Sequence, residues 1–286
     1  MKPTLLVICT VWLGARDTLA INWERTIPFC VGTASAIVLS HVAQARHYWK
    51  VSAPFYINGG GDARYAAGAD KFGHAMAGYA TTVFVQQGLS WSGFDTTTAT
   101  FIGAAVALIN QTLVEYRDAT SIAATGSEYP YLGWSWGDIL ANCTGLALPV
   151  AQQLWGGDVP VLAALRYKYS IHSSGKVEQG LYRSILDDYE SQYHWLSVPI
   201  SAMSPSQTSW LSRFFAVAIG HSVGGIVDKY GVYTYQGQHE LWLALDYNLE
   251  AIPTSSPLLR GLLRVLNLVR LPSPCVRLIP TTAVFG

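Results

Sequence analysis

Four acidic residues, a lysine and a histidine stand at the ends of three apolar segments in the middle of the chain. Asp70, Lys71 and His74 open the first segment, Glu115 and Asp118 lie at the end of the second, and Asp138 opens the third. Asp70 and His74 are four residues apart and would share one face of a helix. Three antiparallel helices would bring these positions to one end of a bundle. The pattern predicts a polar cluster of Asp70, Lys71, His74, Glu115, Arg117, Asp118, Asp138 and Asn142.

Residues of these types could do three kinds of chemistry. The set of His74, Glu115 and Asp138 could bind a divalent metal ion. The same groups could act as general acid and base, with Lys71 and Arg117 holding a phosphate. They could equally form an interhelical network in which basic side chains neutralise the carboxylates. The sequence carries no Gly-x-Ser-x-Gly or Walker-type fingerprint and assigns no catalytic residue.

Geometry separates these alternatives. Asp70, Lys71, His74, Glu115 and Asp138 should lie at similar depth and converge, because buried charges are tolerated only when they are paired. Metal ligands would approach a common point within roughly 2.0–2.6 Å. A network of ion pairs needs only pairwise contacts.

Composition points to a membrane-associated protein. The chain has 286 residues with a formal net charge of zero, half of them hydrophobic, and it contains ten Trp and sixteen Tyr. Low charge and abundant aromatic residues are typical of proteins at a bilayer. The absence of a basic cluster argues against a nucleic-acid partner. The four cysteines are far apart and predict free thiols.

Three regions follow from the pattern along the chain. Residues 1–15 read as a secretory signal peptide without a lipid anchor, an uncleaved anchor being the alternative. Residues 22–157 predict a membrane-associated bundle of about four apolar helices. Residues 158–286 have a different pattern of apolar and polar residues, which predicts a C-terminal α+β part. The expected fold class is thus mainly α, a helical bundle followed by antiparallel strands and an amphipathic helix.

The four apolar runs are marginal membrane spans. They extend over 27–45, 70–91, 96–114 and 133–155, each near the length that crosses a bilayer. Polar residues such as Gln86, Asn110 and Asn142 interrupt them, so a soluble bundle is the alternative. If the runs do span, the basic residues at the cluster end place it in the cytoplasm and the C-terminal region in the periplasm.

The C-terminal region alternates between apolar and polar residues. This pattern predicts strands within 161–171, 193–200, 241–249 and 276–285, a helix over 177–190, and either element over 214–227. Residues 257–270 predict an amphipathic helix, suited to a membrane surface or to covering a core. Its basic and polar face comprises Arg260, Arg264, Asn267 and Arg270.

The motifs together resemble a bacterial domain-of-unknown-function family. The combination is Asp70-Lys71-x-x-His74, Glu115 with Asp118, and Gly133-Trp134-Ser135-Trp136-x-Asp138. Family members are regarded as periplasmic proteins or lipoproteins, with the YfiM lipoprotein as the compact example and long members of Bacteroidetes type. The spacing is more distantly similar to VanZ-like membrane proteins. The resemblance implies an envelope location and these site residues, but no reaction.

The functional expectation is a bacterial cell-envelope protein. A membrane-associated scaffold, or a protein that binds a lipid or envelope component, is expected first. The alternative is an enzyme, metal-dependent or acid–base, that acts on a lipid-linked or cell-wall substrate at the bilayer surface. Expected partners are membrane lipids and envelope proteins. A divalent metal is the one cofactor that the residue types suggest.

Overall fold

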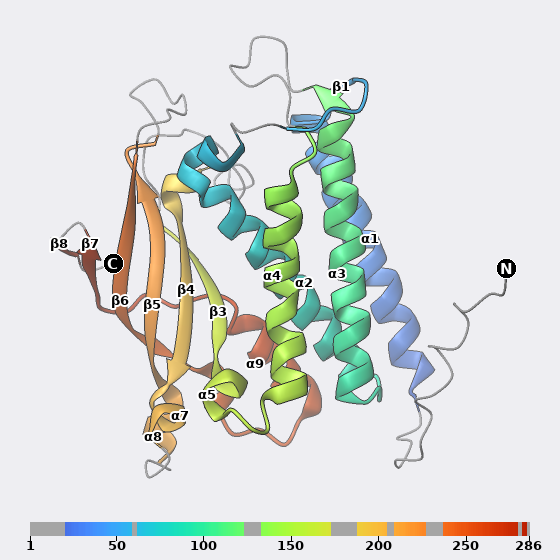
Figure 1. The fold of residues 1–286 in the computed structure, drawn as a ribbon. Helices are drawn as coiled ribbons and strands as arrows, with labels where there is room; N and C mark the ends of the chain where they lie inside the picture. The colour runs from blue at the N-terminus through green and yellow to red at the C-terminus, as the bar shows by residue number, and fades with distance from the viewer. Residues whose placement is uncertain are drawn as a thin grey trace, which may run out of the picture.

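A computed structural model describes residues 21–58, 62–122, 133–172, 188–204, 209–226, 237–279 and 282–284. Four long helices form one side of the molecule and an antiparallel sheet forms the other (Figure 1). The signal peptide expected in residues 1–15 and most of the helix expected over 177–190 lie outside the described residues. The order expected from the sequence, helices followed by an α+β part, is confirmed.

The helical part consists of α1 (Trp23–His47), α2 (Ala69–Trp91), α3 (Thr96–Ala119) and α4 (Trp136–Trp155). Side chains cap three of them: Asn22 accepts from the backbone of α1, Asp95 from α3 and Ser135 from α4. Such caps satisfy amides that have no partner within the helix. The short pair β1 (Val51–Ser52) and β2 (Ser121–Ile122) closes the bundle at the end where α2 begins.

Glycines let the backbones of these helices approach closely. A Cβ placed on Gly145 of α4 would lie 1.9 Å from the carbonyl oxygen of Ala75 in α2. A Cβ on Gly103 of α3 would lie 2.6 Å from the carbonyl oxygen of Thr82 in α2. Ala75 and Thr82 are seven residues apart and share one face of α2, so both crossings lie on that face, where α3 and α4 also contact each other through the hydrogen bond from Gln111 to Asn142. Small residues permit such close contacts.

The C-terminal part is a six-stranded sheet in chain order, every neighbouring pair antiparallel. Short helices connect the strands at the end where α2 and α3 are joined (Figure 1). The elements are α5 (Pro160–Ala164), β3 (Arg166–Ile171), η2 (Tyr189–Ser191), β4 (Gln192–Pro199), α7 (Ile200–Met203), α8 (Trp210–Phe214), β5 (Phe215–Gly224), β6 (Gln238–Tyr247), η3 (Leu249–Ala251), α9 (Pro257–Leu266), β7 (Cys275–Ile279) and β8 (Thr282–Val284), with η1 (Asp62–Gly68) before α2.

The structure resolves one open alternative and differs from two sequence-based expectations. The ambiguous run over 214–227 contains a strand, β5. The expected last strand is a hairpin, because β8 turns back and pairs with β7. The amphipathic helix ends at Leu266, so Arg270 is not on its basic face but is buried against the sheet, with its guanidinium 4.1 Å from the ring centre of Trp195.

The sheet is strongly curled around a polar interior. Lys168 of β3 and Asp246 of β6 are separated by two strands, yet their charged atoms lie 2.9 Å apart. Both side chains are almost completely buried. The extended chain after α9 continues the curl past β3, since the Tyr169 amide donates to the Leu268 carbonyl and the Arg270 amide donates to the Tyr169 carbonyl.

The convex face of the sheet meets the bundle along α2. The Tyr167 hydroxyl donates to the carbonyl of Phe72 at 2.9 Å, and the Phe72 ring stacks on His221 with centroids 4.1 Å apart. Tyr79 and Tyr167 pack beside this contact in a small core with Val83. Helix α2 therefore joins the two halves and is the element around which the molecule is built.

Within the part of the chain that the structure describes, two helices are long and apolar enough to cross a membrane. They are α3 and the part of α1 from Trp23 to Arg46. Only 6% of the most apolar stretch of the α1 segment is buried, compared with 33% for α3. Length and composition therefore agree with the membrane-associated class. Helix α1 lies on the outside of the bundle, and little of its surface is buried against other elements.

Candidate functional site

The polar cluster predicted from the sequence forms where α2, α3 and α4 meet. Asp70, Lys71 and His74 come from the first two turns of α2, Glu115 from the last turns of α3, and Asp138 from the first turn of α4. Helices α2 and α4 begin at the same end at which α3 finishes, as the antiparallel arrangement requires (Figure 1). The predicted convergence is seen in the contacts that join all three helices.

Lys71 connects two carboxylates. Its ammonium lies 3.0 Å from Asp70 Oδ2 and 2.5 Å from Asp138 Oδ1. Tyr189 of η2 adds a hydrogen bond of 2.9 Å to the other Asp70 oxygen. Asp70 and Asp138 occupy the first turns of their helices, where the helix dipole favours negative charge. Lys71 thus supplies the cation that two facing helix N-termini with acidic residues need.

His74 lies between four polar groups of the cluster. Its Nε2 is 3.7 Å from Asp70 Oδ1 and 3.8 Å from Asp138 Oδ1. On the other side of the ring, Nδ1 is 3.6 Å from Glu115 Oε1 and 3.3 Å from Asn142 Oδ1. Both ring nitrogens face oxygen acceptors, which suits an imidazolium with two N–H donors.

Glu115 and Asn142 are the most deeply buried members of the cluster. Glu115 is 1% exposed and Asn142 is fully buried. The Ser135 amide donates to Glu115 Oε2 at 3.3 Å, and Gln111 donates to Asn142 Oδ1 at 2.9 Å. Within the described residues, Glu115 Oε1 and the Asn142 amide nitrogen have no hydrogen-bond partner. A buried polar atom without a partner costs free energy unless a further group completes the site.

Two predicted members take different positions. Asp118 accepts a 2.5 Å hydrogen bond from the Trp49 indole and lies at the edge of the cluster. Arg117 does not join the cluster, because it is exposed and its guanidinium lies 5.8 Å from the ring centre of Trp49. The two residues are adjacent in a helix and therefore point about 100° apart. The role of Lys71 and Arg117 as a phosphate-binding pair stays a prediction.

Three contributors were not predicted from the sequence. Trp49, Tyr189 and the capping residue Ser135 contact the cluster from outside α2 and α3. Ser135 belongs to the Trp-Ser-Trp motif before α4 and was detectable as an N-cap signal three residues before Asp138. Trp49 and Tyr189 lie 69 and 119 residues away from their partners, and no local pattern indicates such contacts.

The electrostatics at this end of α2 and α4 favour a charged histidine. The carboxylates of Asp70 and Asp138 face Nε2 of His74, and Glu115 faces Nδ1. A nearby carboxylate favours the protonated form of an imidazole, so this arrangement stabilises the imidazolium. His74 and Lys71 together neutralise two of the four carboxylates.

The candidate metal ligands differ partly from those expected. One ligand atom each from Asp70, His74 and Asp138 lies within 4.8 Å of the others. Glu115, expected in the set, instead faces the opposite nitrogen of His74. Carboxylate and imidazole donors suit a divalent ion. In the described structure, however, the Lys71 ammonium already bridges the two aspartates, which is the pairwise arrangement of an ionic network.

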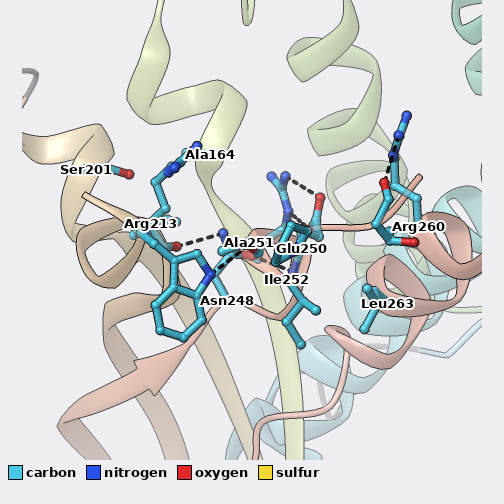
Figure 2. A pocket seen from close by; sticks show the side chains of 14 residues that line it. Ala164, Ser201, Arg213, Asn248, Glu250, Ala251, Ile252, Arg260 and Leu263 are labelled. Carbon is cyan, nitrogen blue, oxygen red and sulfur yellow. Dashed lines mark hydrogen bonds and ion pairs between the residues drawn. The ribbon is translucent and has the colours of Figure 1, made fainter. Parts of the chain in front are cut away.

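A separate cleft of about 570 Å³ lies at the opposite end of the molecule. Figure 2 shows Arg213 and Arg260 on opposite sides of it, with Glu250 between them. Glu250 pairs with Arg166, whose Nε lies 2.5 Å from Glu250 Oε1. The Trp210 indole donates to the Ala251 carbonyl at 3.1 Å. The cleft therefore combines basic and aromatic side chains far from the acidic cluster.

The chain was compared with protein-family models, curated proteins and solved structures, and nothing in any of the three sets matches it. The resemblance to the family of periplasmic proteins and lipoproteins stays a prediction from the motif residues.

Proposed function

We propose that this protein is a membrane-embedded scaffold of the bacterial cell envelope that binds lipid through its outer surface. The observation that carries the proposal is the arrangement of exposed side chains. The outward positions of α1 and α3 are large apolar residues, including Val31 (61% exposed), Leu39 (66%) and Ile109 (62%). A soluble bundle would place polar residues at such positions.

The charged side chains lie toward the two ends of the bundle. The acidic cluster and the exposed Arg46, Lys50 and Arg117 belong to one end of the bundle, and Arg25, Arg213 and Arg260 belong to the other (Figure 1). Between the ends, α1 and α3 carry no charged residue. Two polar ends separated by an apolar surface are typical of proteins that cross a bilayer. Because basic residues occur at both ends, their count does not favour one orientation.

In this proposal the cluster is structural. Its ion pairs and hydrogen bonds join the ends of α2, α3 and α4. Without them, water would separate the charged ends of these helices. Such interhelical polar contacts stabilise bundles in a bilayer by roughly 0.6–2 kcal/mol each. The cluster faces the headgroup region, so an envelope partner or lipid headgroup would meet it there.

Extraction of isolated membranes with alkaline carbonate tests the proposal. Full-length protein should stay in the membrane pellet and be released only by detergent. Release into the carbonate supernatant would contradict a membrane-embedded scaffold. A truncated chain that lacks residues 1–47 is the matched sample. It should also stay in the pellet, because α2 to α4 and the sheet should still hold it in the membrane.

The second candidate is an enzyme, metal-dependent or acid–base, at the bilayer surface. The approach of Asp70, His74 and Asp138 within 4.8 Å favours it. Elemental analysis of protein purified in detergent would support a metal site if one divalent ion per chain is retained and is lost in His74→Asn. Sub-stoichiometric metal in both proteins would contradict a resident metal ion. Only the acid–base version of the enzyme hypothesis would then remain.

A further inference from the structure

We infer that the convex face of the C-terminal sheet lies in the hydrocarbon layer of the membrane, beside the helices, and contacts lipid acyl chains. The inference rests on the proposed membrane location and extends it to a region that the sequence places in the periplasm. Its basis is the distribution of polar and apolar residues between the buried and the exposed face of the sheet. This distribution is the reverse of that in a soluble protein.

The concave face is buried and carries polar side chains and alanines around a core that contains Trp195 and Trp242. Along β6 its residues are Glu240, Trp242, Ala244 and Asp246, all less than 9% exposed. Ser222 donates to Glu240 at 2.8 Å, and Ser197 donates to Asp246 at 2.6 Å. Polar side chains in the interior of the curl therefore bond to one another across the strands.

The convex face carries apolar residues and is exposed where α2 does not cover it. Leu196 of β4 is 48% exposed, Ile219 of β5 is 55% exposed and Leu243 of β6 is 42% exposed. These three residues lie side by side, because Leu196 pairs with Ile219 and Ile219 pairs with Leu243. Val276 of β7 continues the row from its pairing with Leu243. Polar inside and apolar outside is the alternation of a sheet in lipid.

The dimensions of the sheet fit a bilayer. Strands β5 and β6 have ten residues each, within the 9–11 residues that a membrane-crossing strand needs. At one end of β5 the rings of Trp210, Phe214, Phe215 and Tyr247 pack together. Arg213 and Arg260 lie at the same end, around the cleft of Figure 2. Aromatic and basic residues at strand ends are suited to the headgroup level.

The apolar face of the sheet continues onto the helices. Leu259, Leu262 and Leu266 of α9 are exposed next to the sheet, and α3 and α4 present Ile109 and Leu140 on the other side. The edge of β3 is not open to lipid, because residues 268–270 pair with it. An unpaired edge is costly in hydrocarbon, so this pairing is what a lipid-facing sheet requires.

Fluorescence quenching in vesicles tests the inference. Single cysteines at Ile219, Leu243 and Leu196 are placed in the full chain with its native cysteines changed to serine, and each is labelled with an environment-sensitive dye. Ile109→Cys on α3 serves as the helix control and Gln238→Cys, exposed at the end of β6, as the aqueous control. The protein is reconstituted in phosphatidylcholine vesicles with or without brominated acyl chains.

Dyes at Ile219, Leu243 and Leu196 should be quenched by brominated lipid within twofold of the dye at Ile109, whereas the dye at Gln238 should be quenched by iodide. Quenching at Ile109 alone would overturn the inference and leave the membrane location intact. No lipid quenching at any position would overturn both. Protection of the sheet positions from lipid and from iodide would mean that a second copy or another protein covers the face, which also overturns the inference.

Discussion

The ammonium of Lys71 and the carboxylate of Asp138 lie 2.5 Å apart, across the contact between the first turns of α2 and α4. The Asp138 carboxylate is 9% exposed and the Lys71 side chain 20% exposed. An ion pair with so little access to water is screened weakly, and loss of one partner leaves the other charge buried. Removal of this pair should therefore destabilise the protein more than removal of any other contact in the cluster.

Lys71→Met should destabilise the protein by about 3–5 kcal/mol, the usual effect of leaving a buried partner without its counter-charge. The double variant Lys71→Met/Asp138→Asn should recover part of the loss, because one uncompensated carboxylate is removed. Arg117→Met is the control and should change stability by less than about 0.5 kcal/mol, since it is an exposed position. Urea unfolding in detergent micelles measures all three. Equal effects of Lys71→Met and Arg117→Met would contradict the assignment.

Gly145→Ala should destabilise the bundle by about 3 kcal/mol or more, because the added methyl would collide with the Ala75 carbonyl and the helix backbones must separate. Gly32→Ala is a matched substitution in the interior of α1. A Cβ there meets no atom within 4 Å, so it should be neutral or stabilise by up to about 1 kcal/mol through helix propensity. Thermal unfolding of the two variants compares them, and similar midpoints would show that α2 and α4 do not cross at Gly145.

Ile219→Arg should reduce stability in lipid by about 2–4 kcal/mol, the cost of a basic side chain on the lipid face of a membrane-embedded sheet. Gln238→Arg, at the exposed end of β6, should be close to neutral. Unfolding by denaturant in phospholipid vesicles measures the difference. In a sheet that faces water, both substitutions would fall within about 0.5 kcal/mol of the parent protein.

Stability should fall in acid as Glu250 becomes protonated. Burial alone would raise the pKa of Glu250, but attraction to Arg166 and Arg264 lowers it to about 2 in the folded protein. A lowered pKa means that the ionised form stabilises the fold at pH values above the ordinary value near 4.5, and that this contribution disappears as pH falls toward 2.

The measurement is the melting temperature of the parent protein and of Glu250→Gln between pH 7 and pH 2.5. The difference between them should be constant above pH 5 and shrink steadily below pH 4.5. A difference that persists unchanged at pH 2.5 would show that Glu250 does not act through its charge.

The sequence by itself determined which residues gather at the cluster. Asp70 and His74 share a helical face because a turn has 3.6 residues, and Glu115 and Asp138 meet them because short connections make successive helices antiparallel. These are local rules, so they apply without knowledge of the rest of the chain. The sequence also determined the strands that alternate regularly, such as β6.

The tertiary structure decided the roles of individual side chains and of the sheet. Arg117 was expected in the cluster and points away from it, because the rotation of α3 about its axis depends on packing against α2. Tyr189 reaches Asp70 from 119 residues away, which no local pattern specifies. Alternation in β5 and β6 likewise shows that two faces differ, but only the curl that joins Lys168 to Asp246 decides that the polar face is the inside.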